Sequence, residues 1–445
     1  MYKQAPSQRW TSYDGWNWNG FQERLESFIP TLDMVMLQHH AELLIGQKCR
    51  VSEPFSAGQY SVCFELVAED DSLIIARVRL PRHPAASSNM TEEDEQYQVT
   101  CELATMRLLA QRLPQLKIPS VYAYEGPGSQ RALEFGAPYM LIQGFYGNAL
   151  QDLVYDHATG CVSTGFYALS AAEQEQLITQ WTAVQAMLAT VTSSQIGSIC
   201  DVTESGEPVI GRISSAAMNN MFPQGPFQNA AEYFTALAMG VLRESSEYDG
   251  IQEQPELLTL GAIVFLDIVR NTPLFESHGP YHLNHMDLHV GNILVDDDLN
   301  FMAIIDWEFA QTAPWQVTSY PRLFQLRPSD DTLEKVLNDP KHIRYKDAKL
   351  QDDARQLYSE KFDEAAAKYG GGSNPYGSYT EVLNGAASRI YEAFMELGHV
   401  PEQDQHLIDE MVLLAFGVDD GTNWYLKNLD NRWRADNSFR LSHMS

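Results

Sequence analysis

Residues 285–308 read HMDLHVGNILVDDDLNFMAIIDWE, and this stretch decides the fold assignment because it combines strands, a turn and many polar side chains. It holds two histidines and five aspartates. Two β-rich runs, NILVD and FMAIID, flank a turn at Asp297–Asn300 and predict a short hairpin. Three interpretations are open: a solvated acidic hairpin, a metal-ligand cluster, or the catalytic loop of a phosphotransferase.

The first two interpretations use only part of the stretch. Asp and Asn are common turn residues, which favours the solvated hairpin for each residue taken alone. His-x-Asp followed five residues later by Asn, however, is expected by chance only roughly 0.03 times in such a chain. In a metal hydrolase, His285, Asp287 and His289 would be the ligands, since alternate strand residues point to one face. That interpretation leaves Gly291 and Asn292 without a role.

The third interpretation gives each polar position a task. In-line phosphoryl transfer needs a carboxylate that orients and deprotonates the attacking hydroxyl, and two hard oxygen ligands for Mg²⁺. Asp287 can supply the first, and Asn292 and Asp306 can supply the second if the hairpin between them folds back. A catalytic loop and a metal aspartate on either side of one hairpin is also the protein-kinase arrangement. The spacing therefore favours a phosphotransferase.

The composition of the whole chain narrows the partners. Its 445 residues predict two or three domains, and 44% hydrophobic residues predict an ordered globular fold. The net charge of −29 repels phosphate backbones and anionic headgroups, which argues against nucleic acid and membrane surfaces as partners. A cationic or neutral small molecule fits this charge better.

Cysteine usage and the lengths of apolar runs predict a cytoplasmic protein. The five cysteines are odd in number and widely spread, so they suggest neither a disulfide framework nor a zinc site. The first residues lack the apolar core of a signal peptide, and no run approaches the length that crosses a bilayer.

Residues 1–146 predict a helical extension followed by a small β-rich lobe. Residues 1–50 carry apolar residues at helical spacing, broken near Pro30. Residues 51–146 then alternate β-rich runs with one amphipathic helix, after a loop that contains Gly58. The expected strands are 60–68, 73–80, 117–125 and 137–147, and the expected helix is 97–113.

Residues 147–445 read mainly as helix, interrupted by the hairpin quoted above. The predicted class is therefore α+β, with a small β-rich N-lobe and a larger, mainly α C-lobe. The expected helices are 173–191, 228–244, 254–270, 351–369, 380–397 and 403–416, with a connector at 371–379.

The sequence resembles the aminoglycoside phosphotransferase and choline kinase superfamily, whose catalytic stretch runs H-G-D-L-H-x-G-N-x-L…I-D-W-E. His285–Leu294 and Ile305–Glu308 match it, with Met286 in place of the usual Gly. The resemblance covers about residues 50–325 and is nearest to the fungal branch, in which IDWEFA precedes a Pro-aromatic segment and an IGS tripeptide occurs mid-chain, here 196–198. It implies a bilobal, protein-kinase-like fold.

The resemblance also implies roles for residues outside the hairpin. The loop with Ser56 and Gly58 would cover the nucleotide phosphates. Arg77 would hold the α- and β-phosphates, and Arg79, on the same strand face, is its competitor. Protein kinases have Lys at the position of Arg77, and the planar guanidinium of Arg and the ammonium of Lys are not interchangeable. Glu102 would pair with this cation. Gln143 and Phe145 would belong to the hinge at 143–146, whose backbone would bind adenine.

The predicted function is ATP- and Mg²⁺-dependent transfer of the γ-phosphate to a hydroxyl of a small molecule, with an amine as the second choice. Asp287 would be the catalytic base, and Asn292 and Asp306 would hold the metal. Two alternatives stay open: a nucleotide-binding pseudokinase with little or no turnover, and the metal hydrolase described above. Neither the acceptor nor the oligomeric state can be read from the sequence.

Overall fold

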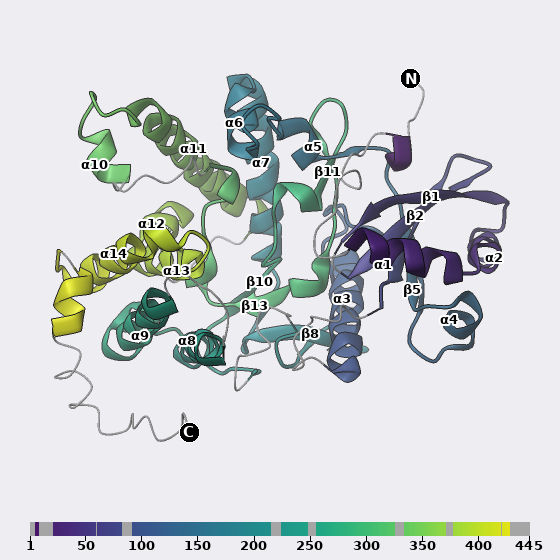
Figure 1. Cartoon of the computed structure of the whole chain (residues 1–445), viewed down its shortest axis with the longest axis horizontal. Helices are drawn as coiled ribbons and strands as arrows, with labels where there is room; N and C mark the ends of the chain where they lie inside the picture. The colour runs from purple at the N-terminus through teal and green to yellow at the C-terminus, as the bar shows by residue number, and fades with distance from the viewer. Residues whose placement is uncertain are drawn as a thin grey trace.

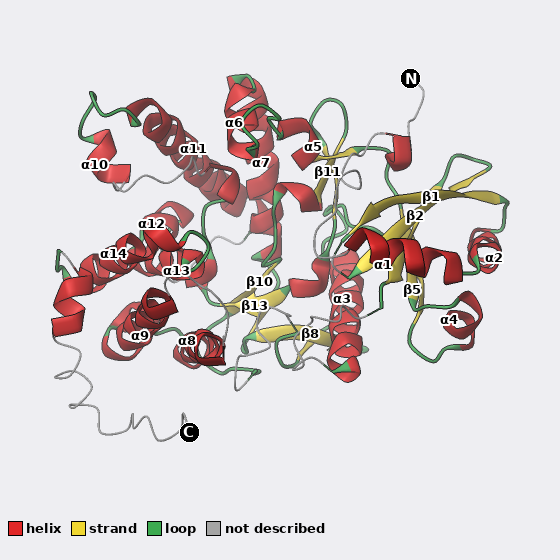
Figure 2. Cartoon of the chain, viewed as in Figure 1, coloured by secondary structure: helices red, strands yellow, loops and turns green. Residues whose placement is uncertain are grey.

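The structure is a computed structural model in which a β-sheet at the N-terminal side lies beside a larger, mainly helical part (Figures 1 and 2). The predicted α+β class, with a β-rich N-lobe and a mainly α C-lobe, is confirmed. The described residues are 5–8, 21–58, 60–81, 91–214, 224–247, 255–324, 333–370, 377–419 and 421–427.

The N-lobe sheet is antiparallel, with the strand order β1-β2-β3-β5-β4. The expected strands are present, but β1 was expected to be a loop. Its register shifts on both sides of Pro54, as expected for a residue that cannot donate to the ladder, and these bulges hide the alternation of a strand in the sequence. The strands are β1 Cys49–Ala57, β2 Ser61–Ala68, β3 Leu73–Arg79, β4 Val121–Glu125 and β5 Tyr139–Gln143.

Two N-terminal helices cover one face of this sheet. The helices α1 (Phe21–Phe28) and α2 (Met34–Ile45) bury Phe28 and Leu37 in one cluster with Phe64 of β2. The short helix α4 (Gln130–Phe135) adds Phe135 to the same cluster. The segment 1–50 therefore contributes, through its described residues, to the core of the N-lobe.

The long helix α3 (Glu92–Arg112) lies between the sheet and the helical part (Figure 1). It begins five residues before the expected start at residue 97, because Thr91 and Asp94 form a capping box. Its apolar residues Leu108 and Leu109 are buried in the main cluster of the C-lobe. This packing holds α3, and with it Glu102, at the junction of the two parts.

The C-lobe contains the expected helices, although 380–397 is split where the backbone of Gly385 is extended. Two small sheets, with strand orders β7-β10-β13-β8-β9 and β12-β11-β6, were foreseen only in the strands β11 and β12. The connector at 371–376 lies outside the described residues. No described helix has the length and apolar character needed to span a bilayer.

The described helices of the C-lobe are α5 Leu150–Val154, α6 Val162–Ala168, α7 Ala171–Leu188, α8 Ala230–Glu247, α9 Pro255–Asn271, α10 Leu333–Leu337, α11 Tyr345–Tyr369, α12 Tyr379–Asn384, α13 Ala386–Glu396 and α14 Asp404–Phe416. The strands are β6 Asn148–Ala149, β7 Thr192–Ser193, β8 Gly197–Val202, β9 Pro208–Ile210, β10 Tyr281–Asn284, β11 Ile293–Val295, β12 Phe301–Ile304 and β13 Gln311–Ala313.

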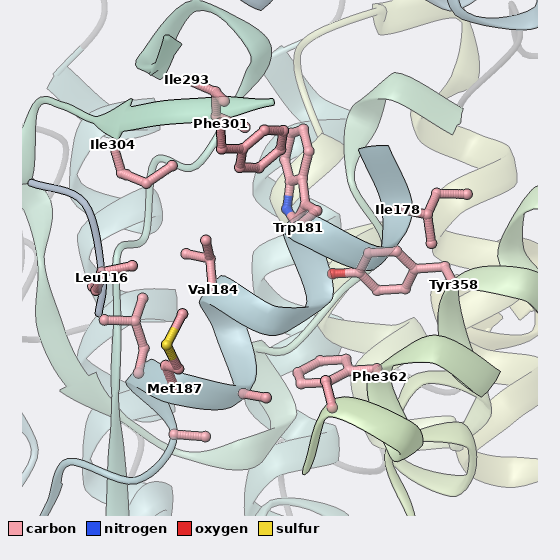
Figure 3. Close-up of a cluster of buried hydrophobic side chains, with 14 of the residues drawn as sticks. Leu116, Ile178, Trp181, Val184, Met187, Ile293, Phe301, Ile304, Tyr358 and Phe362 are labelled. Atoms are coloured by element: carbon pink, nitrogen blue, oxygen red, sulfur yellow. The ribbon is translucent and has the colours of Figure 1, made fainter. Parts of the chain in front are cut away.

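The main hydrophobic cluster anchors the hairpin that contains the quoted motif (Figure 3). Ile293 of β11 and Ile304 of β12 belong to one buried cluster with Trp181 and Val184 of α7 and Tyr358 of α11. Side chains in such a core pack at crystal-like density, so the backbone that carries them has little freedom to shift. The position of the polar residues at the hairpin ends is therefore set by the packing of two long helices.

A buried histidine on β10 leads to a prediction about stability and pH. Nδ1 of His282 donates to the carbonyl oxygen of Ala189 at 2.5 Å, and the ring centroids of His282 and Trp315 lie 3.8 Å apart. Burial lowers the pKa of His282 to about 4, although the hydrogen bond to Ala189 opposes this effect. In the unfolded chain a histidine titrates near pH 6.5, so the unfolded state takes up the proton first.

The free energy of unfolding should therefore fall as the pH drops from about 6.5 towards 4, by up to about 1.4 kcal/mol per pH unit from this group. The His282→Gln variant keeps a donor for Ala189 but does not titrate. Urea unfolding at pH 7 and pH 5 should show a smaller loss of stability for this variant than for the wild type. An equal loss in both proteins would contradict the assignment.

Candidate functional site

A pocket of about 440 Å³ lies between the N-lobe sheet and the hairpin of β11 and β12. Its wall includes Cys63 and Ile75, which the sequence analysis did not name, although Ile75 alternates with Arg77 along β3 and so shares its face. Asp287 does not line the pocket but is hydrogen-bonded to a residue that does. The eight predicted nucleotide and metal residues all line it: Ser56, Gly58, Arg77, Glu102, Gln143, Phe145, Asn292 and Asp306.

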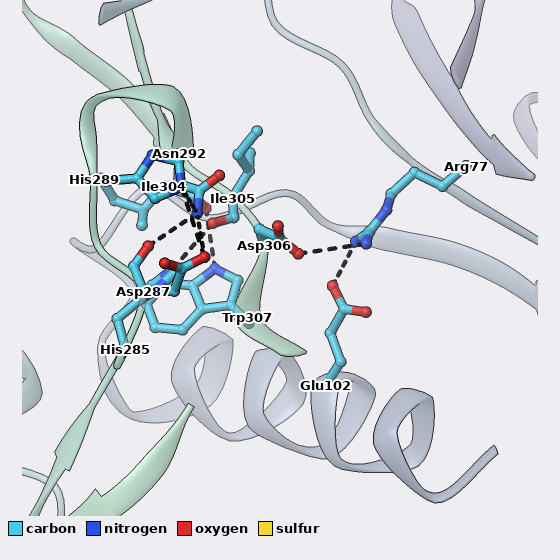
Figure 4. Close-up of polar contacts among 10 residues, drawn as sticks. All are labelled: Arg77, Glu102, His285, Asp287, His289, Asn292, Ile304, Ile305, Asp306 and Trp307. Atoms are coloured by element: carbon cyan, nitrogen blue, oxygen red, sulfur yellow. Dashed lines mark hydrogen bonds and ion pairs between the residues drawn. The ribbon is translucent and has the colours of Figure 1, made fainter. Parts of the chain in front are cut away.

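Arg77 connects the two lobes across this pocket (Figure 4). Its Nη1 donates to Oε1 of Glu102 on α3 at 2.5 Å, and its Nη2 lies 3.5 Å from Oδ1 of Asp306. Burial opposes the charge of Arg77, but Glu102 and Asp306 outweigh it and hold the pKa of the guanidinium above its ordinary value. Arg79 instead pairs with Glu95 at 3.4 Å. Of the two candidate cations, Arg77 is therefore the one paired with the predicted glutamate and metal residue.

The loop after β10 holds Asp287 against Asn292 (Figure 4). Nδ2 of Asn292 donates to the backbone oxygen of Asp287 at 2.9 Å and to its Oδ2 at 3.3 Å. Nε2 of His289 lies 3.6 Å from the same Oδ2. Burial raises the pKa of Asp287, His289 opposes this effect, and Asp306 adds to it. A carboxylate with a raised pKa accepts a proton more readily, which suits a general base.

The histidine that opens the motif supports the loop. Nε2 of the buried His285 donates to the carbonyl oxygen of Ile305 at 3.0 Å, and its ring centroid lies 4.5 Å from that of Trp307. Burial lowers the pKa of His285 to about 4, so the ring is neutral at pH 7. In the part of the chain that the structure describes, no three His, Cys, Asp or Glu side chains are grouped to hold a metal ion. The hydrolase interpretation therefore finds no support.

Three residues of the stretch 285–308 have a left-handed backbone conformation: Met286, Asp306 and, in the hairpin turn, Leu299. Met286 has φ of 64° and Asp306 has φ of 68°, a region that costs a residue with a side chain roughly 1–2 kcal/mol. The usual residue at the position of Met286 in the resembled family, glycine, adopts this conformation without that cost. The side chain of Met286 packs against the second hydrophobic cluster of the C-lobe, formed largely by α8, α9, α13 and α14. This packing offsets part of the backbone strain.

The oxygens beside Arg77 suit a hard divalent cation. Oδ1 of Asp306 is buried and makes no hydrogen bond to a described residue. The hydrogen bonds of Asn292 to Asp287 use its amide nitrogen, so its carbonyl oxygen is the atom that could ligate a metal. Mg²⁺ is commonly held by one or two such protein oxygens together with substrate phosphates, so the absence of a larger ligand group does not oppose it. The pKa of the neighbouring Glu308 is raised to about 8 by its burial and by the charges of Asp306 and Glu102.

The predicted hinge and phosphate loop differ in how they are held. The backbone N–H of Gln143 donates to the oxygen of Ser120 at 2.8 Å, and its Oε1 accepts from the N–H of Ser120 at 3.3 Å. Gln143 is thus tied to the neighbouring segment, and Phe145 follows it on the pocket wall. In the turn after β1, the N–H of Gly58 donates to Ser61, and a Cβ added at Gly58 would meet no atom within 4 Å. The backbone there is open to a ligand.

A second cavity of about 750 Å³ lies among the helices α10 to α14. Arg355 crosses it to pair with Glu392 at 3.2 Å, and Glu396 on its wall pairs with Arg322 at 2.8 Å. Burial raises the pKa of Asp287, and the charge of Arg322 opposes this rise. A charge beside this cavity therefore affects the predicted catalytic base.

The chain is similar to solved structures of phosphotransferases and kinases of small molecules. No curated protein matches the chain. A candidate aminoglycoside phosphotransferase of Ralstonia eutropha is 13% identical, with 89% of this chain and 99% of that chain covered and a TM-score of 0.44. The macrolide 2′-phosphotransferase of Brachybacterium faecium is 15% identical (93% and 99% covered, TM-score 0.38). The ethanolamine kinase of Plasmodium vivax is 11% identical (89% and 86% covered, TM-score 0.36).

The family assignment rests on the sequence. The model of the APH phosphotransferase enzyme family matches residues 64–317, which is more than half of the chain. The matched range includes Arg77, Glu102, Asp287, Asn292 and Asp306. The fungal branch of the resemblance stays a prediction. The wider resemblance is confirmed, and the chain belongs to the phosphotransferase enzyme family.

Proposed function

We propose that this protein transfers the γ-phosphate of ATP, with Mg²⁺, to a hydroxyl group of a small molecule, with an amine as the second choice. The observation that carries the proposal is the meeting of Arg77, Glu102, Asn292 and Asp306 in one pocket, with Asp287 hydrogen-bonded to Asn292 at its edge. Phosphoryl transfer is catalysed mainly by positioning and by stabilising charge, and this set of residues can do both.

Each residue has a task that its contacts support. Arg77 would contact the phosphates with its guanidinium, which Glu102 holds in place. Asn292 and Asp306 would hold Mg²⁺, which when bound neutralises charge on the β- and γ-phosphates. Asp287 would orient the acceptor hydroxyl and accept its proton at a carboxylate oxygen. The backbone of the turn at Gly58 would lie over the phosphates, since a Cβ built on Gly58 would meet no described atom within 4 Å.

The acceptor would reach Asp287 from the C-lobe helices. The cavity of about 750 Å³ among α10 to α14 is large enough for a drug-sized molecule, and Glu396 on its wall pairs with Arg322, whose charge opposes the rise that burial causes in the pKa of Asp287. The net charge of −29 favours a cationic or neutral acceptor over an anionic one.

The decisive experiment separates an active kinase from a pseudokinase. Isothermal titration of the purified protein with ATP should give binding that tightens when Mg²⁺ is added. Release of ADP should then be measured against a panel of small alcohols, amino alcohols and sugars. Magnesium-dependent ATP binding with transfer to an acceptor supports the proposal, and ATP binding without transfer to any acceptor favours the pseudokinase. The absence of nucleotide binding would overturn the proposal.

The two arginines of β3 offer a matched pair of variants. Arg77→Ala should weaken ATP binding by about tenfold or more, because hydrogen bonds to charged groups contribute about 1.5–3 kcal/mol. Arg79→Ala should leave the affinity for ATP within about twofold, since Arg79 is paired with Glu95 and stacked 4.9 Å from the centroid of Tyr60. Calorimetry on both variants checks this ordering, and the reverse ordering would transfer the phosphate role to Arg79.

A further inference from the structure

A short segment that precedes the N-lobe sheet in the chain forms part of the wall of the nucleotide pocket. It contains the 3₁₀ helix η1 (Pro6–Gln8), the short purple helix nearest the N mark in Figure 1, which packs against β1. Ala5 and Pro6 are buried, and the N–H of Gln8 donates to the oxygen of Ala5 at 2.9 Å, which closes one turn. Pro6 lines the same pocket as Arg77. The segment therefore belongs to the walls of the predicted nucleotide site.

A buried glutamate on β2 holds this segment. The N–H of Ser7 donates to Oε2 of Glu65 at 2.9 Å, and the hydroxyl of Ser7 donates to Oε1. Glu65 is only 4% exposed, and the hydrogen bonds that described residues make to its carboxylate both come from Ser7. A buried carboxylate without donors costs free energy, so these two bonds favour the position of the segment against the sheet. We call the pair Ser7–Glu65 the latch.

The latch lies at the hinge end of the pocket. Glu65 stands two residues after Cys63 on β2 and pairs across the strands with Ile75, so it shares the face of the sheet that carries both. Cys63 and Ile75 line the pocket. Ile75 in turn pairs with Ile142, the residue before the predicted hinge at 143–146. The segment that Glu65 holds is therefore placed where the adenine is expected.

We propose that residues 5–8 form a strap that closes the hinge end of the nucleotide pocket, and that the nucleotide enters and leaves when the Ser7–Glu65 latch opens. This inference rests on the proposed use of ATP. One turn of chain and two hydrogen bonds hold the strap, so its local opening costs less free energy than unfolding of the sheet. Passage through a gate is slowed by the fraction of time for which the gate is open. The latch therefore sets the speed of nucleotide exchange.

Three roles of the latch have different kinetic signatures. If the pair only anchored the chain to the sheet, its loss would lower the melting temperature and leave nucleotide exchange in the folded protein unchanged. If the strap bound the nucleotide directly, its loss would raise the dissociation rate constant alone. A gate must open before both steps, so its loss raises the association and dissociation rate constants by the same factor and leaves their ratio nearly unchanged.

Stopped-flow fluorescence of the full chain with Mg²⁺ and N-methylanthraniloyl-ADP measures both rate constants. Ser7→Asp sets a second carboxylate against Glu65 and should raise both by about tenfold, as expected when a hydrogen bond to a charged group is lost. The dissociation constant should stay within about threefold of the wild type. In the double variant of Ser7→Asp with Glu65→Gln, the new amide can donate to the new carboxylate. Both rate constants should then return to within about twofold of the wild type.

Gln8→Glu is the matched control. It adds the same charge to the next residue, which is exposed and whose N–H bonds to Ala5, so both rate constants should stay within about twofold of the wild type. Unchanged rate constants in Ser7→Asp, or a rise in dissociation alone, would overturn the gate although the nucleotide site stands. If the wild type does not bind the labelled ADP, the proposed function itself fails, and this inference fails with it.

Discussion

Asp287→Asn should lower the rate of phosphoryl transfer by about 10²–10⁴, the range in which a positioned general base contributes to a reaction. The amide has nearly the same shape but cannot take the proton of the acceptor hydroxyl. Asn292 donates to the backbone oxygen of Asp287 as well as to the carboxylate, so the loop should keep its form. Transfer is measured as ADP released with an acceptor identified from the panel.

The binding of ATP should distinguish a catalytic defect from a folding defect in this variant. Because Asp287 does not line the nucleotide pocket, the dissociation constant for ATP should stay within about twofold of the wild type. Asp296→Asn is the control, since Asp296 caps the hairpin turn through Asn300 and should leave transfer nearly intact. Full activity of Asp287→Asn would exclude Asp287 as the base.

Asp306→Asn should abolish most of the gain in ATP affinity that Mg²⁺ provides. Oδ1 of Asp306 is buried, makes no hydrogen bond to a described residue and lies 3.5 Å from Nη2 of Arg77. The change therefore removes the negative charge of a proposed metal ligand that is also a partner of the cation. We expect the dissociation constant of Mg²⁺-ATP to rise by about 100-fold, at the upper end of what changes around a metal site cause. Titration calorimetry with and without Mg²⁺ measures both constants.

The comparison without metal isolates the cause. In excess EDTA, the affinity of Asp306→Asn for ATP should be close to that of the wild type, because Glu102 still holds Arg77. The double variant of Asn292→Ala with Asp306→Asn should add little further loss of Mg²⁺ dependence, since neighbouring ligands of one ion are not additive. An equal loss of affinity with and without Mg²⁺ would show that Asp306 acts through Arg77 rather than through a metal.

Local pattern was sufficient for most of the N-lobe and for the hairpin. β-rich runs predicted β2 and β3, and two further runs on either side of the turn Asp297–Asn300 predicted the hairpin of β11 and β12. The same pattern failed for β1, where Pro54 interrupts the ladder, and for the sheet β7-β10-β13-β8-β9, whose strands are two to six residues long. Strands this short carry too few residues to show a pattern, and they are stabilised by pairing with strands that are distant in sequence.

By itself, the sequence determined the α+β class, the hairpin motif and the identity of the polar residues around it, because these depend on neighbours within about twenty residues. The tertiary structure decided which cation faces Glu102: Arg77 and Arg79 share one strand face, and only the packing of α3 distinguishes them. It also placed Asp287 outside the lining of the pocket that the other predicted residues share. Burial and pairing depend on contacts between distant segments, so they become visible only once the chain has folded.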